Sequence, residues 1–132
     1  MRIIAIILMI ASVCFAQEKK ATEIDFTQTI MGYDGKAIPN GDTKSPADLT
    51  LSDVCVMALS TPIETDRQST GLDKFKLDTL ARKIYHNKKV SLTVEDISTI
   101  KERIGKVYGP VIVGAAWRIL DPAVEEKGDK GK

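Results

Sequence analysis

Hydrophobic and polar residues follow two different periods along this chain, and each period predicts a different kind of element. Between residues 24 and 30, apolar and polar side chains alternate, which is typical of a half-buried strand. Asp34 and Gly35 come next and favour a tight turn, because glycine tolerates positive φ and aspartate can bond its own backbone. The pattern therefore predicts an N-terminal β-hairpin that ends near Pro39.

Two registers suit a hairpin around this turn. A two-residue turn pairs Met31 with Ile38, whereas a three-residue loop of Asp34, Gly35 and Lys36 pairs Gly32 with Ile38. We prefer the second register, because it places Ile38 on the apolar face of the first strand. A slip by one residue would turn that side chain away from the core.

From residue 50 onward, apolar residues recur at helical spacing. The first helix follows Thr50, which forms a capping box with Asp53, and it must end before Pro62. The polar stretch 61–71 is predicted to be a loop and the most mobile segment. A second helix covers roughly residues 72–86. Four of its apolar side chains are expected to face the core: Phe75, Leu80, Ala81 and Ile84.

Two further helices complete the predicted domain. One begins after Thr93, a good N-cap, and presents a single apolar stripe: Ile97, Ile100, Ile104, Val107 and Tyr108. The last runs from Pro110 to Leu120 and is stopped by the Asp121-Pro122 pair. The predicted fold class is α+β and mostly helical, with the N-terminal β-hairpin packed beside about four short α-helices.

The stretch GKVYGPVIVGAAWR holds three glycines, at positions 105, 109 and 114. It lacks the lysine and the hydroxyl residue that a phosphate-binding loop needs after its last glycine. We expect Gly109 to end one helix in a left-handed conformation and Pro110 to open the next. Gly105 and Gly114 are then expected to permit close approach of another backbone.

The first sixteen residues, MRIIAIILMIASVCFA, have the layout of a secretory signal peptide. Cleavage is predicted after Ala16, which would make the protein periplasmic or secreted. The alternatives are a membrane anchor, a lipoprotein acylated at Cys14, or a buried N-terminal element in a cytoplasmic protein. We assign residues 17–22 to a polar lead-in, 23–122 to a single α+β domain, and 123–132 to a disordered tail.

The net charge and the candidate reactive residues narrow the range of possible functions. The chain carries a net charge of +1, and loss of Arg2 with the leader leaves none, so nucleic acid is not expected as a partner. No membrane contact is expected beyond the signal peptide, because the stretch from Gly105 to Gly109 lies among charged residues rather than in an apolar segment of about 20 residues. Cys55 lies on an apolar helix face and His86 is the only histidine, at the end of a basic helix. Neither has the partners of a catalytic or metal site. No cofactor, metal or enzymatic activity is predicted.

Three residues near the C-terminus are candidates for contact with a partner protein. Tyr108, Trp117 and Arg118 belong to the residue types most often found as anchors in interfaces. For Trp117 we prefer a role in the core, because the domain has few other aromatic residues, and contact with a partner is the alternative.

Two segments carry a resemblance to known proteins: LTLSDVCVMAL, and the segment from KFKLDTLARKIYHNKK to VGAAWRILD. The chain resembles small uncharacterised phage and prophage proteins over roughly residues 22–121. The resemblance implies an accessory, chaperone-like protein of virion or tail assembly that binds another phage protein. We therefore predict that this chain is a non-catalytic interaction protein of phage type. This role is compatible with a homo-oligomeric state. The alternative is an exported envelope module, unrelated to phage, that binds a peptide or small ligand.

Overall fold

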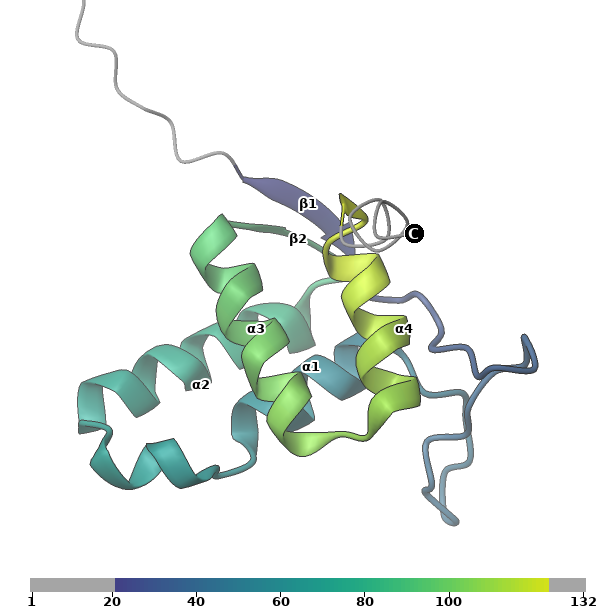
Figure 1. The fold of residues 1–132 in the computed structure, drawn as a ribbon, viewed down its shortest axis with the longest axis horizontal. Helices are drawn as coiled ribbons and strands as arrows, with labels where there is room; N and C mark the ends of the chain where they lie inside the picture. The colour runs from purple at the N-terminus through teal and green to yellow at the C-terminus, as the bar shows by residue number, and fades with distance from the viewer. Residues whose placement is uncertain (1–20, 124–132) are drawn as a thin grey trace, which may run out of the picture.

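A computed structural model describes residues 21–123, so the predicted leader and most of the predicted tail lie outside the described residues. Two short strands and four α-helices make up the domain, which confirms the α+β, mostly helical class (Figure 1). In chain order the elements are β1 (Thr22–Asp25), α1 (Leu51–Ser60), the 3-10 helix η1 (Glu64–Gln68), α2 (Gly71–His86), β2 (Lys89–Leu92), α3 (Val94–Val107) and α4 (Pro110–Leu120).

The two strands form an antiparallel pair, but the partner of β1 is not the segment that ends near Pro39. β1 pairs with β2 across the fold, with Ile24 opposite Val90. Both of these side chains are buried, whereas their strand neighbours Glu23 and Ser91 are exposed. Pairing two amphipathic strands in this register buries both apolar faces at once, which the short local hairpin could not do.

The turn at Asp34 and Gly35 is present, in a register that differs from both predicted ones. Met31 bridges to Ala37, and the Ile38 amide donates to the Ile30 carbonyl over 3.0 Å. The prediction that Ile38 packs against the core is nevertheless confirmed. The loop comprises residues 33–35, with Gly35 at a φ of 73°, and the Gly32 amide donates to the Lys36 carbonyl over 2.8 Å. This register places Ile38 directly opposite Ile30.

Residues 26–50 are mostly irregular, yet backbone hydrogen bonds attach them to the rest of the domain. The amide of Phe26 donates to the Lys88 carbonyl beside the strand pair. Ile30 donates to the Leu49 carbonyl, and Leu51 donates to the carbonyl of Gln28. This segment therefore lies beside the start of α1, on the right of the view in Figure 1.

Each of the first three α-helices begins with the same four-residue capping box. Thr50, Thr70 and Thr93 each accept from the backbone amide three residues later, and the aspartate at that position accepts from the threonine amide. The predicted starts of α1 and α3 are confirmed. Since each box pairs two otherwise unsatisfied amides with side chains, the helix starts are set locally.

The core surrounds α1, which packs against both α2 and α3. All five apolar residues that helical spacing placed on one face of α1 are buried: Leu51, Val54, Cys55, Ala58 and Leu59. On α2, Ala81 and Ile84 are buried as expected, and Leu80 packs against the core. Phe75, however, is 66% exposed, so its predicted inward direction is wrong.

The corner between α3 and α4 differs from the prediction. Gly109 has a φ of −80° and a ψ of 174°, so it is an extended N-cap of α4 rather than a left-handed end of α3. Pro110 does occupy the first turn of α4. Near Gly105 and Gly114 the closest atoms are side-chain atoms of Trp117 and Arg118, so neither glycine serves a close approach of another backbone.

Candidate functional site

One buried arginine joins α3 to the end of α1 and to η1. Arg103 is 6% exposed, and its Nε donates to the Ala58 carbonyl over 3.0 Å. Nη2 donates to the Thr61 carbonyl over 2.8 Å. Nη1 and Nη2 also form a bidentate pair with the two carboxylate oxygens of Asp66, each at 2.9 Å. The guanidinium thus caps the end of α1, where helix carbonyls lack intrahelical partners.

The carboxylate of Asp66 is held by a second contact, because its Oδ2 also accepts from the Ile63 amide over 2.8 Å. Hydrogen bonds from Arg103 and then from this amide lower the pKa of Asp66 from 3.8 to about 2. The stretch 61–71 was predicted to be a loop, but η1 occupies part of it and is fastened to α3 through this carboxylate.

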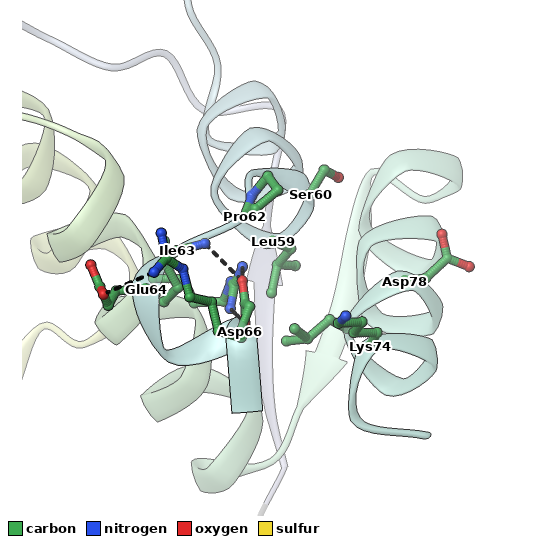
Figure 2. A pocket seen from close by; sticks show the side chains of 11 residues that line it. Leu59, Ser60, Pro62, Ile63, Glu64, Asp66, Lys74 and Asp78 are labelled. Carbon is green, nitrogen blue, oxygen red and sulfur yellow. Dashed lines mark hydrogen bonds and ion pairs between the residues drawn. The ribbon is translucent and has the colours of Figure 1, made fainter. Parts of the chain in front are cut away.

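A cleft of about 700 Å³ opens beside this pair (Figure 2). Leu59, Ser60 and Pro62 lie on one side of it, and Lys74 and Asp78 extend from α2 on the other. Its lining mixes acids and bases and includes neither histidine nor cysteine. All three nitrogens of Arg103 already donate within the protein, so we regard the Arg103 and Asp66 pair as a structural connection.

A second groove, which we call the Tyr108 groove, has a volume of about 580 Å³. It lies where residues 38–41, α1, the end of α2 and the α3–α4 corner meet. Its apolar walls include Ile38, Val56, Met57, Tyr85, Tyr108 and Ile112. Met57 and Tyr85 are 55% and 70% exposed, although apolar and aromatic side chains of this size are usually covered.

Tyr108 is half-buried in this groove, and burial raises the pKa of its hydroxyl. The polar lining comes from Asn40, Thr50, Ser52 and Asp53. A mainly apolar lining with a few polar groups is the composition of sites that hold a peptide or small molecule.

Trp117 lies away from Tyr108, against α3. Its indole nitrogen donates to the Lys101 carbonyl over 3.1 Å, and the Lys101 ammonium stands 4.6 Å from the ring centroid. The same ammonium is paired with Asp121 at 3.2 Å. Trp117 therefore helps to join α3 and α4, and its remaining surface lines a separate groove with Ile97 and Leu120.

Arg118, the third predicted contact residue, is exposed on α4. The structure therefore does not bring the three candidates into one cluster: Tyr108 and Trp117 line different grooves. Sequence reasoning missed Met57 and Tyr85, which stand beside Tyr108. It also missed Arg103, although the spacing places this arginine three residues after Ile100 on the buried stripe of α3.

The two residues with intrinsic reactivity have simple surroundings. Cys55 is fully buried among core side chains, and burial raises the pKa of its thiol. His86 is exposed, and its ring makes an edge-on contact with Tyr85 at 5.2 Å between centroids. Within residues 21–123 there is no group of three or more His, Cys, Asp or Glu placed to hold a metal ion.

No family model, curated protein or solved structure matches this chain. None of the helices within residues 21–123 has the length and apolar character needed to span a membrane.

Proposed function

We propose that this protein is a non-catalytic interaction module that receives a segment of another protein in the Tyr108 groove. The observation that carries the proposal is the position of two exposed large side chains, Met57 and Tyr85, at a groove that also contains Tyr108. Tyrosine and methionine are both enriched in protein interfaces, and tyrosine supplies a large contact area at low cost in conformational entropy.

The groove also constrains the chemistry of the partner. Its walls are mainly apolar, so the bound segment needs at least one large apolar side chain that can be removed from water. Asp53, which also lines the groove, uses Oδ2 to accept from the Thr50 amide. Its negative charge favours a hydrogen-bond donor on the flanking residues of that segment. The volume of about 580 Å³ falls within the roughly 300 to 1,000 Å³ typical of ligand sites.

The resemblance to small phage and prophage proteins supports an accessory role in virion or tail assembly, in which the partner would be a phage structural protein. The leader-like segment MRIIAIILMIASVCFA supports the alternative of an exported envelope module with the same groove. Neighbouring genes for capsid and tail proteins would favour assembly, and a mature N-terminus at Gln17 would favour export.

Site-specific photo-crosslinking in the native cell tests the proposal. A photoreactive residue at Met57 should form an adduct with one dominant protein, which mass spectrometry identifies. The matched control is the same residue at Lys106, which is also exposed on a helix but does not line the groove. The adduct peptide, made synthetically, should bind the purified protein and lose affinity with Tyr108→Ala. Equal adducts from both positions would overturn the proposal.

A further inference from the structure

The outward side of α2, which we call the α2 outer face, combines exposed apolar and basic side chains. Leu72 and Phe75 are 63% and 66% exposed, so two large apolar groups stand in water near the start of the helix. A rotation of about 100° per residue places exposed basic groups on the same side. The α2 outer face consists of Leu72, Phe75, Lys76, Arg82, Lys83 and His86.

Positive charge is concentrated in this part of the chain. Residues 71–89 hold six Lys or Arg against two Asp, whereas the whole chain has a net charge of only +1. One of the two acids, Asp73, accepts from the Thr70 amide in the capping box of α2. The other, Asp78, is paired with Arg82 at 2.8 Å and so partly neutralises that arginine. The Lys83 ammonium donates to the Ser91 carbonyl over 2.9 Å but keeps its charge. The positive charge of the α2 outer face therefore comes mainly from Lys76 and Lys83.

The apolar pair on this face is not explained by the fold. Ala81 and Ile84 carry the contact of α2 with the core, and Leu72 and Phe75 project away from it. Neither residue lines any of the grooves described above. They are thus protruding groups without a surrounding cavity, which suits insertion into a soft apolar phase better than docking into a shaped pocket.

We propose that the α2 outer face binds the surface of an anionic lipid membrane, with lysine and arginine at the phosphate groups and Leu72 and Phe75 inserted at the acyl boundary. Peripheral helices that bind membranes contain both basic residues and Phe or Leu, and basic clusters are attracted to anionic lipid surfaces. The inference departs from the expectation of no membrane partner, which rested on the lack of an apolar segment long enough to span a bilayer. It is independent of the Tyr108 groove.

Flotation with lipid vesicles tests the proposal on the full chain. All proteins carry Ile7→Asp and Leu8→Asp, so that the apolar leader does not itself bind lipid. We expect binding to vesicles that contain phosphatidylglycerol and little binding to phosphatidylcholine alone. Binding should fall between about 0.1 M and about 1 M salt, as the Debye length shrinks from roughly 10 to roughly 3 Å.

Two variants of the α2 outer face have matched controls elsewhere. Lys76→Gln with Lys83→Gln should weaken binding about 25-fold, at about fivefold for each basic residue near the membrane. Lys36→Gln with Lys44→Gln removes the same charge from the exposed segment 31–50 and should change binding little. Phe75→Ser should weaken binding about tenfold or more, whereas Tyr33→Ser, at a side chain that is 87% exposed, should not.

Three results would overturn the proposal. The first is equal binding to charged and neutral vesicles, and the second is an equal loss with the control variants. The third is binding to polyglutamate or duplex DNA as strong as to vesicles and unaffected by Phe75→Ser, which would assign the face to an acidic protein segment or a nucleic acid. Circular dichroism and the melting temperature confirm that each variant is folded.

Discussion

Arg103 of α3 and Asp66 of η1 form a bidentate pair in which both nitrogen to oxygen distances are 2.9 Å. Their side chains are 7% and 14% exposed, so the pair is largely withdrawn from water. The same guanidinium donates to the carbonyls of Ala58 and Thr61, which end α1. One side chain thus holds α1, η1 and α3 together, and its removal is the most informative test of the fold.

Arg103→Met should lower the free energy of unfolding by about 3 kcal/mol or more. The substitution keeps much of the side-chain volume but removes the guanidinium donors from the Ala58 and Thr61 carbonyls. The Asp66 carboxylate then keeps only its hydrogen bond from the Ile63 amide. Denaturant unfolding measures the loss. Arg82→Met is the matched control, because Arg82 pairs with Asp78 at 2.8 Å with side chains 70% and 52% exposed. The control should cost less than about 1 kcal/mol, and equal losses would contradict the structural role of Arg103.

Acid should weaken the domain through Asp66. The pKa of this carboxyl is lowered from 3.8 to about 2 in the folded protein, so its ionised form stabilises the fold at pH values above the unfolded pKa. That contribution is lost as the pH falls from about 4 toward 2. We expect the stability difference between the wild type and Asp66→Asn to shrink over this window. A difference that stays constant from pH 5 to pH 2 would show that Asp66 does not titrate with folding.

Two glycines should respond oppositely to substitution. Gly35 has a φ of 73°, a conformation that side chains with a Cβ rarely adopt, so Gly35→Val should cost about 1 kcal/mol or more. Gly109 is extended at the N-cap of α4, and a Cβ there would meet no atom within 4 Å. Gly109→Ser should therefore leave the melting temperature unchanged or raise it, since serine is a good N-cap. A large loss with Gly109→Ser would contradict the extended corner.

Cys55 should be inert in the folded protein. Its thiol is buried in the core and burial raises its pKa, so little thiolate is accessible at neutral pH. A thiol reagent such as Ellman's reagent should react only after denaturant is added, at the rate of unfolding or local opening. Cys14 would also react in an unprocessed chain, so the assay uses Cys14→Ser. Rapid labelling of this variant without denaturant would contradict the buried position of Cys55.

Helix positions could be predicted from the sequence because their determinants are local. Thr50 with Asp53 and Thr93 with Asp96 satisfy their own backbone amides within four residues, so their effect does not depend on the rest of the fold. Pro62 and Pro110 limit helices in the same local way. The apolar face of α1 could also be predicted, because its apolar residues recur at regular helical spacing. This helix packs against both α2 and α3.

The candidate site was predicted only in part. Tyr108 does line a groove, but its neighbours Met57 and Tyr85 come from α1 and α2 and were not recognised. On their own helices these residues are exposed and look like ordinary surface positions. Only the packing of α1 against α2 brings them to the same groove as Tyr108. The periodicity within a single helix does not predict this packing between helices.

The sequence by itself determined the four α-helices, the starts of α1 and α3 and the apolar face of α1, because these depend on interactions among residues close in the chain. The α+β class was also predicted, although the strand that pairs with β1 is a distant segment. The tertiary structure alone decided that β1 pairs with β2, that Arg103 reaches Asp66, and that Phe75 faces outward. Each of these depends on which distant surfaces become buried together. Such pairings depend on how much apolar area is buried and how many hydrogen bonds form in the whole fold. Local sequence patterns do not give these totals.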